Sequence, residues 1–500
     1  MTKLAADVSI KYKLNYRKRD GMDQVRTRFA PSPTGYMHVG NLRTALYAYL
    51  IAKKAKGRFI LRIEDTDRQR QVQGASDIIF DTLKDAGLFW DEGPDIGGPY
   101  EPYIQSERKD SYLEYAKSLV EKGGAYYCFC TKEEIDARCS IDEGAARYDG
   151  LCRSLSGADA DAHLSAGAPY VVRQKMPKEG STVFSDLIYG DIEVDNRELE
   201  DQILIKSDGM PTYNFANVVD DHVMAISHVI RGNEYLSSSP KYTLLYRAFG
   251  WEVPAYIHCP QVMKDHRHKL SKRNGDASYQ DFTEKGYLPA AIINYLALLG
   301  WSPKGEREIF SLPELVDEFD ISGMSKSPAI FDGEKLKYIN AEYIRALTAE
   351  QFMEYALPFI KQAVNRDDVD LRVLCETLQP RCEFFADIPA KLSFIDSLPE
   401  YDNELYFNKK MKTSPETAKE ALKASLAVLE PLEDFSKESL HGALFSLIDS
   451  LGVKNGWLLW PLRVALSGLP LTPGGGIELA AILGKEDAVK RIKAGLNQLG

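Results

Sequence analysis

The chain has 500 residues, of which 44% are hydrophobic and 27% are charged, and its formal net charge is −11. These are ordinary values for globular proteins, and the length suits about three or four units of roughly 100 to 200 residues each. No run of about 18 apolar residues occurs, which argues against a membrane span. An acidic chain does not bind nucleic acid through its overall charge, so motifs must decide whether RNA is a partner.

The sequence has seven cysteines, and its basic N-terminal segment lacks the apolar core of a secretory signal. An odd number of cysteines without such a signal predicts reduced thiols and a cytoplasmic setting. We expect residues 1–24 to form an N-terminal extension, in which residues 1–21 are either dispensable or precede the true start at Met22.

The first recognisable unit, at 26–68, has the pattern of a strand, a turn, a helix and a second strand. The segment 25–30 is predicted to be a strand, and a loop rich in proline and glycine follows at 31–35. Apolar residues then recur with helical spacing, at Leu42, Ala45, Leu46, Tyr49 and Leu50. Gly57 is predicted to end this helix, and 59–63 to be a strand buried on both faces. The whole pattern is that of a βαβ unit.

This unit favours nucleotide binding, because phosphate is attracted to the helix N-terminus where a strand of such a sheet turns into a helix. His38 lies just ahead of the helix and can donate to a phosphoryl oxygen. Gly40 has no side chain and lets a ring or a phosphate approach the backbone. From these two residues alone, a buried structural histidine beside a packing glycine is the alternative.

Two motifs together resemble the signature of one family. FAPSPTGYMHVGN, followed by RIEDTDR, is similar to the signature of the glutamyl-tRNA synthetases of the bacterial type, within the class I aminoacyl-tRNA synthetases. HVGN stands where the class carries its His-x-Gly-His motif, with Asn41 in the last place. Downstream, KLSKR matches the KMSKS loop of the class in its KxSKR form.

The resemblance implies a fold class and a domain order. The fold is an α/β, doubly wound parallel nucleotide-binding (Rossmann-like) catalytic domain with an α+β insertion, followed by an all-α C-terminal region. The implied domains are the N-terminal extension (1–24), the first half of the catalytic domain (25–108), an inserted tRNA acceptor-binding domain (109–212), the second half of the catalytic domain (213–260), a stem-contact region with the KLSKR loop (261–346) and a helical anticodon-binding domain (347–500).

Several segments in the middle of the chain carry expectations of their own. Alternating patterns predict strands at 170–176, 181–190 and 191–196, all within the insertion. The segment 213–219 is predicted to return to the catalytic sheet. Asp220, Asp221 and His222 resemble a metal cluster, but solvated or helix-capping acids are the favoured interpretation.

The function that the resemblance implies is that of a glutamate–tRNA ligase. Such an enzyme activates L-glutamate with ATP to glutamyl-adenylate, releases pyrophosphate, and transfers glutamate to the 3′-terminal adenosine of tRNA(Glu). Whether tRNA(Gln) is also charged is left open. The resemblance further implies Mg²⁺ as a cofactor, no membrane partner, and a chain that acts as a monomer in the cytoplasm.

The resemblance also assigns the residues that bind ATP. They are Gly35, His38, Gly40, Asn41, Lys269, Leu270, Ser271, Lys272 and Arg273. Four of them are expected to act in catalysis by contacting the phosphates or by letting ATP approach, namely His38, Gly40, Lys269 and Lys272.

Glutamate has two carboxylates and one ammonium, so its pocket needs guanidinium groups and at least one acid. The resemblance assigns Arg28 and Arg231 to carboxylates and Glu64 to the ammonium. The rest of the pocket is expected to consist of Ala30, Ser32, Tyr213 and Asn217. For each arginine alone, a surface ion pair is the alternative.

For tRNA, the resemblance implies that Arg70 reaches the acceptor end and that Arg381 reads the last anticodon base. A plain helix-surface arginine is the alternative for Arg381.

A zinc site is a further implication of the resemblance, with the ligands Cys128, Cys130, Tyr148 and Cys152. Ser154 stands where some relatives have a histidine. Tetrahedral zinc takes four ligands, and here it would be structural. Reduced, semi-buried thiols without metal are the alternative.

Three other functions compete with this interpretation. A glutaminyl-tRNA synthetase would differ around the proline-rich turn, and a short tRNA-modifying relative would lack the helical C-terminal region. A non-catalytic RNA-binding paralogue would have no need of both phosphate motifs.

Overall fold

The computed structural model describes residues 24–67, 72–138, 141–142, 145–146, 148–271 and 278–500. Residues 1–23 of the expected extension, together with Arg70, Lys272 and Arg273, lie outside the described residues. The chain divides into two compact units. Unit 1 contains residues up to 281 and 293–332, and unit 2 contains 282–292 and 333–500.

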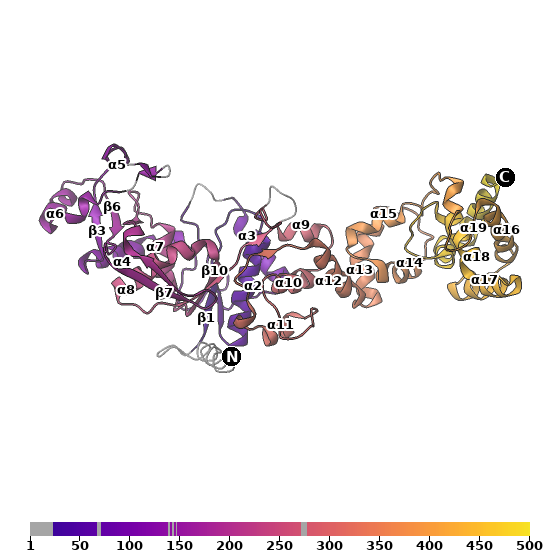
Figure 1. The fold of residues 1–500 in the computed structure, drawn as a ribbon, viewed down its shortest axis with the longest axis horizontal. Helices are drawn as coiled ribbons and strands as arrows, with labels where there is room; N and C mark the ends of the chain where they lie inside the picture. The colour runs from indigo at the N-terminus through magenta and orange to yellow at the C-terminus, as the bar shows by residue number, and fades with distance from the viewer. Residues whose placement is uncertain (1–23, 68–71, 139–140, 143–144, 147, 272–277) are drawn as a thin grey trace. The chain divides into compact units, whose positions relative to one another are not determined.

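Unit 1 is built on a six-stranded sheet in the order β2-β1-β10-β11-β7-β8. Strands β1, β7 and β10 of this sheet are labelled in Figure 1. All neighbouring strands from β2 to β7 run parallel, and only β8 is antiparallel to its neighbour. The strands are β1 (Arg26–Phe29), β2 (Arg58–Leu61), β7 (Ser181–Asp186), β8 (Gly190–Asp195), β10 (His228–Gly232) and β11 (Ala255–Cys259). The predicted class, a mostly parallel α/β sheet, is confirmed.

The predicted βαβ unit is present as β1, helix α2 (Val39–Lys54) and β2. The apolar stripe of α2 packs on the sheet, and Leu42, Leu46 and Leu50 are fully buried. The left-handed residue after the helix is Lys56, at φ 53°, rather than Gly57. Gly57 is needed for another reason, because a Cβ there would lie 2.1 Å from the carbonyl oxygen of Val25.

The other helices of unit 1 cover this sheet and its insertion. They are α3 (Ala75–Asp85), α4 (Lys109–Glu121), α5 (Lys132–Arg138), α6 (Gly157–Ser165), α7 (Tyr213–Val223), α8 (Ser239–Phe249) and α11 (Leu312–Glu318). Two further helices contain residues of both units, α9 (Tyr279–Glu284) and α10 (Pro289–Leu298). A short parallel pair, β12 (Val262–Met263) and β13 (Ala329–Ile330), follows the central sheet.

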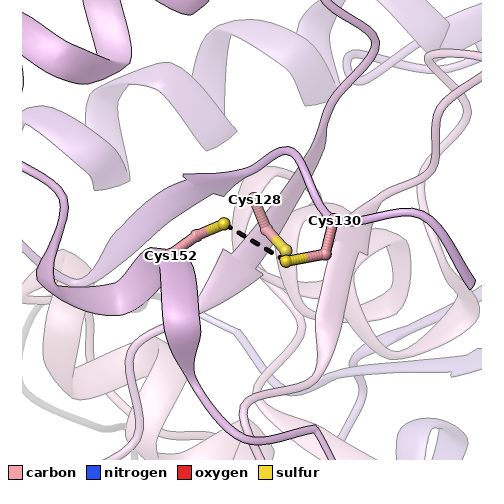
Figure 2. Close-up of side chains that lie close together, drawn as sticks. All are labelled: Cys128, Cys130 and Cys152. Atoms are coloured by element: carbon pink, nitrogen blue, oxygen red, sulfur yellow. Dashed lines mark hydrogen bonds between the residues drawn. The ribbon is translucent and has the colours of Figure 1, made fainter. Parts of the chain in front are cut away.

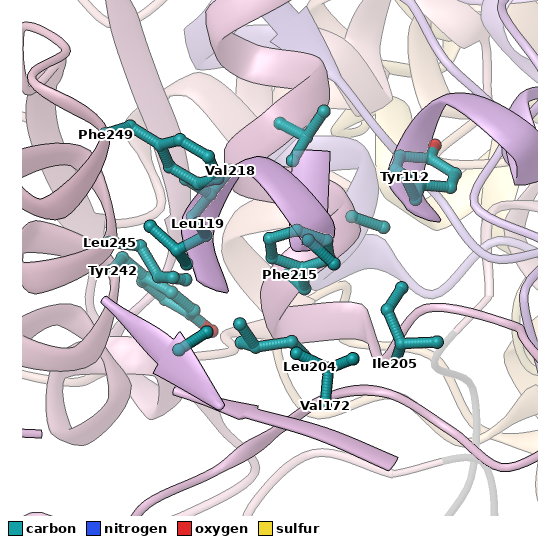
Figure 3. Close-up of a cluster of buried hydrophobic side chains, with 14 of the residues drawn as sticks. Tyr112, Leu119, Val172, Leu204, Ile205, Phe215, Val218, Tyr242, Leu245 and Phe249 are labelled. Carbon is teal, nitrogen blue, oxygen red and sulfur yellow. The ribbon is translucent and has the colours of Figure 1, made fainter. Parts of the chain in front are cut away.

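The insertion has its own antiparallel sheet in the order β3-β6-β9. Its strands are β3 (Ala125–Cys128), β6 (Val171–Gln174) and β9 (Ile203–Ile205), and a short pair, β4 (Ile141–Asp142) and β5 (Ala145–Ala146), lies nearby in sequence. Figure 3 shows the apolar core in which α4, α7 and α8 meet this sheet, with Leu119, Phe215 and Leu245 among its buried members. The catalytic and inserted parts therefore share one core.

Two sequence-based expectations about elements were wrong. Residues 213–219 form the start of helix α7 instead of a strand. The hairpin of β7 and β8 belongs to the central sheet, because β7 pairs with β11, and not to the sheet of the insertion. Both errors concern long-range packing, which local alternation of apolar residues does not report.

Unit 2 is helical, as predicted for the C-terminal region. Its helices are α12 (Gly333–Arg345), α13 (Ala349–Ile360), α14 (Leu371–Leu378), α15 (Ile388–Leu392), α16 (Pro415–Leu429), α17 (Lys437–Leu451), α18 (Asn455–Ser467) and α19 (Gly476–Gln498). Capping boxes begin α13 at Thr348 and α16 at Ser414, where side chains satisfy free backbone N–H groups. Every helix in the described part of the chain is too short or too polar to cross a membrane.

Candidate active site

The two predicted phosphate motifs are joined by one histidine at the N-terminus of α2. His38 caps this helix, and its Nδ1 accepts the N–H of Gly40 at 3.0 Å. Nε2 therefore carries the ring proton of the neutral imidazole and donates it to the carbonyl oxygen of Leu270, 3.2 Å away in the KLSKR segment. The ring connects the HVGN and KLSKR motifs directly.

Gly40 leaves room for this arrangement. A Cβ at Gly40 would lie 3.1 Å from Nδ1 of His38 and 3.8 Å from the side chain of Val262. A side chain here would crowd the ring that caps the helix, so the absence of a Cβ keeps both the cap and the approach to the backbone open.

A cavity of about 450 Å³ lies between these motifs. Its lining includes six of the residues predicted to bind ATP, namely His38, Gly40, Asn41, Lys269, Leu270 and Ser271. Gly35 is not among the lining residues. The prediction missed the other lining residues, which are Arg43, Thr44, Gly232, Glu234, Pro260, Gln261 and Val262. Of these, Arg43 is buried and donates to the carbonyl oxygens of Pro260 and Leu299, so it fixes the backbone at Pro260, which precedes the KLSKR segment in the chain.

Arg28, expected to bind a carboxylate of glutamate, is bound to a carboxylate of the protein. Its Nε and Nη2 donate to the two oxygens of Asp221 at 3.0 and 3.2 Å, and its Nη1 donates to the carbonyl oxygen of Ile230. Burial would raise the pKa of Asp221, but Arg28 and Arg62 outweigh burial and hold that pKa below its ordinary value. Arg28 therefore already has a counter-charge before any substrate arrives.

Arg62 connects this pair to Glu64, the acid expected to receive the ammonium. The fully buried Arg62 donates to Asp221 Oδ1 at 2.8 Å and to Glu64 Oε1 at 2.8 Å. No hydrogen bond reaches Glu64 Oε2 from the residues that the structure describes. Burial raises the pKa of Glu64 above its ordinary value, although Arg62 opposes it. One oxygen of Glu64 is thus available to a cation.

Asp220 and Asp221 correct a sequence-based interpretation, because neither is a solvated or capping acid. Both are almost fully buried at the end of α7. Asp220 accepts from Arg108 at 2.8 Å and from the hydroxyl of Tyr112 at 2.8 Å. The resulting ion network contains three guanidinium groups and three carboxylates, namely Arg28, Arg62, Arg108, Glu64, Asp220 and Asp221.

Arg231 differs from Arg28 in having no carboxylate partner among the described residues. It is the next-to-last residue of strand β10, is only 5% exposed, and donates to Nε2 of His258 at 3.1 Å and to Oγ of Ser239 at 3.2 Å. Its guanidinium lies 4.5 to 5.4 Å from the ring centres of Tyr235, Tyr242 and Tyr256. A buried cation in such surroundings favours binding of an anion.

Two other predicted pocket residues share a face of α7 with Asp221. Tyr213, Asn217 and Asp221 follow one another at intervals of four residues, which places them on one side of a helix. Asn217 donates to the carbonyl oxygen of Tyr213, and the Tyr213 ring lies 5.5 Å from that of Tyr235, which also contacts Arg231. Once 213–223 is known to be helical, this spacing identifies Asp221.

Ala30 and Ser32 lie in the loop after β1. The N–H of Glu64 donates to the carbonyl oxygen of Pro31 at 3.0 Å, so this loop runs beside Glu64. Ala30 is half-buried and Ser32 is exposed.

Three of the four predicted zinc ligands form a compact cluster in the insertion (Figure 2). The sulfur atoms of Cys128, Cys130 and Cys152 lie within 4.8 Å of one another, and those of Cys130 and Cys152 are 3.5 Å apart. The thiol of Cys128 donates to the hydroxyl oxygen of Tyr148 at 3.3 Å. Two thiolates on one tetrahedral zinc are about 3.8 Å apart for Zn–S bonds of about 2.3 Å, so this donor set fits the ion.

The six cysteines that the structure describes are free thiols. In unit 2, Arg381 is exposed, and it donates to the carbonyl oxygen of Pro473 while its own carbonyl oxygen accepts from Lys391. The Arg381 side chain forms no ion pair with the described residues of unit 2.

Comparison with known families accounts for nearly the whole chain. Residues 24–338 match the family model "tRNA synthetases class I (E and Q), catalytic domain", and residues 351–496 match "Anticodon binding domain". The chain therefore belongs to the class I tRNA synthetases of the E and Q type. This confirms the family that the two motifs indicated.

The curated relatives and the solved structure that the chain resembles are glutamate–tRNA ligases. The chain is 58% identical to the glutamate–tRNA ligase of Clostridium botulinum (strain Loch Maree / Type A3) over 480 residues, which is 95% of this chain and 99% of the relative. It is 56% identical to that of Clostridium acetobutylicum over the same shares. A crystal structure of a glutamate–tRNA ligase from Elizabethkingia meningosepticum, in complex with its amino acid, matches with a TM-score of 0.85 at 36% identity, covering 96% of this chain and 100% of that one.

Proposed function

We propose that this protein activates L-glutamate with ATP, releases pyrophosphate, and transfers the glutamyl group to the 3′-terminal adenosine of tRNA(Glu). The observation that carries the proposal is the end of β10. There, Arg231 is a buried cation without a carboxylate partner among the residues that the structure describes, and the next residue, Gly232, lines the cavity that contains His38. An anionic amino acid and a nucleotide would thus bind side by side.

The first step needs no nucleophile from the protein. A carboxylate oxygen of glutamate attacks the α-phosphorus of ATP, the bond to the bridging oxygen breaks, and pyrophosphate leaves. A ribose hydroxyl of the tRNA then attacks the carbonyl carbon of the adenylate, and AMP leaves. Catalysis therefore comes from positioning the reactants and from neutralising the charge on the phosphoryl oxygens.

The residues around the cavity supply these two effects. The Nε2–H of His38, which donates to Leu270 in this structure, would donate to a phosphoryl oxygen instead. Lys269 lines the same cavity and would meet the pyrophosphate, with Lys272 and Arg273 following it in the chain. Mg²⁺, held mainly by the phosphates, would supply further positive charge.

Glutamate is proposed to bind with its ammonium at the open Oε2 of Glu64 and its side-chain carboxylate at Arg231. Arg28 would contact a carboxylate through guanidinium hydrogens that Asp221 does not use, since each Nη carries two. Tyr213 and Asn217 would line the space between. The neutral ion network beneath then leaves Arg231 to select an acidic side chain over an amide, because glutamine brings no charge.

The parts of the chain are proposed to divide the binding of tRNA. In the insertion, a cavity of about 900 Å³ beside the cysteines is lined by Phe129 and Tyr170, with Lys132 and Arg173 among its basic residues. Aromatic faces and cations of this kind suit an unpaired nucleotide strand, which supports an acceptor-end role. Arg70 would reach the acceptor end, the region at 261–346 would contact the tRNA stem, and Arg381 would reach the last anticodon base. We place the working enzyme in the cytoplasm as a monomer.

Charging assays test the function and Arg381 together. The full-length protein should charge tRNA(Glu) with glutamate, and exchange of pyrophosphate into ATP should depend on glutamate and tRNA. Arg381→Ala should raise the KM for tRNA(Glu) about tenfold, the order expected for one base contact, while the KM for glutamate stays unchanged. Parallel reactions with tRNA(Gln) show whether it is a second partner. Efficient charging with glutamine, and none with glutamate, would contradict the proposal.

We infer that the cysteine cluster holds one structural zinc ion through Cys128, Cys130, Cys152 and Tyr148. Protein purified without chelator should contain about one zinc per chain, and Cys152→Ser should contain far less. Cys375→Ser is the matched control, since it removes a buried free thiol elsewhere and should leave the zinc content intact. Elemental analysis that finds well under one zinc in the parent protein would rule this site out.

A further inference from the structure

Two buried, hydrogen-bonded residues, Asp186 and His258, lie next to Arg231. His258 in β11 is fully buried, with Nδ1 2.7 Å from Oδ2 of Asp186 and Nε2 3.1 Å from Nε of Arg231. The three residues come from the adjacent strands β7, β11 and β10. Asp186 and His258 are 72 residues apart in sequence, so no local pattern reveals their contact.

The chemistry of the two partners fixes the tautomer of the imidazole. A guanidinium can only donate, so Nε2 of His258 must present its lone pair to Arg231. The proton therefore sits on Nδ1 and is donated to Asp186. Burial lowers the pKa of His258, and the charge of Arg231 lowers it further, which keeps the ring neutral despite the raising effect of Asp186.

Asp186 is itself held firmly. Its Oδ1 accepts the N–H groups of Ile188 and Tyr189 at 2.8 Å each, and its Oδ2 accepts the N–H of His258 at 3.0 Å. Three backbone donors thus stabilise the ionised carboxylate and set its position relative to the ring.

Arg231 is held along the edge that faces His258. Nε donates to His258, and Nη2 donates to Ser239, whose own proton goes to the carbonyl oxygen of Tyr235. Among the described residues, Nη1 makes no hydrogen bond. The guanidinium is therefore fixed at one edge and open at the other.

A neutral acceptor at this place has a consequence that a carboxylate would not have. Asp221 both orients and neutralises Arg28. His258 orients Arg231 without neutralising it, because the negative charge of Asp186 is one imidazole ring further away. The full attraction of the guanidinium for an incoming carboxylate is retained.

We propose that His258, oriented by Asp186, is a positioning residue that aims the guanidinium of Arg231 at the side-chain carboxylate of glutamate. The proposal rests on the glutamate contact of Arg231 put forward above. His258 does not touch the substrate. It acts by offering an uncharged acceptor that locks the buried edge of the arginine.

Two amide substitutions in the full-length enzyme test the hydrogen bonds at Nδ1 and Nε2 of His258 separately. In His258→Gln, the side-chain oxygen can take the place of Nε2 and accept from Arg231. In His258→Asn, the shorter amide can still donate to Asp186 but leaves Arg231 without this acceptor. In steady-state charging of tRNA(Glu), His258→Asn should have a glutamate KM at least tenfold above the parent value, and His258→Gln should stay within about threefold of it. The KM for ATP should stay within about twofold in both.

The outcomes are distinguishable. Equal glutamate KM values for the two variants would overturn the positioning role, and so would a change in the KM for ATP as large as that for glutamate. KM does not depend on the fraction of active enzyme, so partial misfolding does not obscure the comparison. If His258→Asn yields no active protein, His258→Gln decides alone. A glutamate KM more than tenfold above the parent value in His258→Gln overturns the proposal, and a near-parental value supports it. Arg231→Met, measured alongside, reports separately on the underlying contact: an unchanged glutamate KM there removes the proposed pocket itself.

Discussion

Replacing Arg231 by methionine should raise the KM for glutamate about 100-fold or more, while the KM for ATP changes less than about twofold. Removing one partner of a buried, hydrogen-bonded charge pair costs about 2–5 kcal/mol, or roughly 30-fold to several-thousand-fold in affinity. Arg231 belongs in this class because it is buried and has no carboxylate of its own among the described residues. Methionine keeps an unbranched apolar stem in the tyrosine-lined space. Steady-state charging of tRNA(Glu) at varied glutamate and varied ATP measures both constants.

Arg247→Met is the matched control for this prediction. Arg247 lies on α8 of the same unit, is exposed, and donates to the carbonyl oxygen of Val183. Its replacement should leave both constants at parental values. A glutamate KM that is equally insensitive to Arg231→Met would mean that the substrate carboxylate is bound elsewhere, with Arg28 as the next candidate.

Comparison of Arg28 and Arg231 shows what sequence could and could not predict. Both arginines follow from motifs at strand ends, and β1, α2 and β2 follow from local patterns of apolar, proline and glycine residues. No local pattern indicates that Arg28 is neutralised by Asp221, which is 193 residues away along the chain. The different roles of two similar side chains thus depend on partners that only folding brings together.

Helix α7 illustrates the same limit in another way. Its residues Phe215, Val218 and Val219 are all buried, so a short apolar run is compatible with either a helix or a strand. The error mattered, because the strand interpretation hides the common face of Tyr213, Asn217 and Asp221.

His38 is a contrasting example in which local sequence was sufficient for placement. Its position ahead of an apolar helical stripe predicted a helix N-terminus, and it is the N-cap of α2. The hydrogen bond from its Nε2 to Leu270 spans 232 residues and was not predictable from spacing. It does explain physically why the two motifs occur together.

The ion network beneath the glutamate pocket should make Arg62 the most sensitive of the charged residues for stability. Arg62→Leu should lower the free energy of unfolding of unit 1 by about 3–5 kcal/mol, because it leaves buried carboxylates without their cation. Arg62 is fully buried and is shared by Glu64 and Asp221, each at 2.8 Å. Urea unfolding monitored by hydrogen exchange in β1 and β10 measures this unit by itself, since one transition need not describe a chain of two units.

The loss of unfolding free energy in Arg62→Leu should depend on pH, and the sign follows from the pKa shifts of the two acids. The pKa of Asp221 is lowered in the folded protein, so its ion pairs stabilise fully above the unfolded-state pKa of about 3.9 and are lost as pH falls through the lowered value. Glu64, with a raised pKa, becomes neutral at a higher pH and then needs no cation. The destabilisation by Arg62→Leu should therefore be largest near neutral pH and should shrink below about pH 4.

Arg197→Leu is the control, because it removes a salt bridge that is exposed instead of buried. Arg197 pairs with Asp195 at 2.5 Å, but its side chain is 78% exposed. Water screens such a pair, so its loss should leave the unfolding transition of unit 1 at the parental urea concentration. If Arg62→Leu also unfolds at that concentration, the buried carboxylates must be neutral at pH 7. Glu64 could then not receive the ammonium of glutamate as an anion, and the assignment of the pocket would have to change with it.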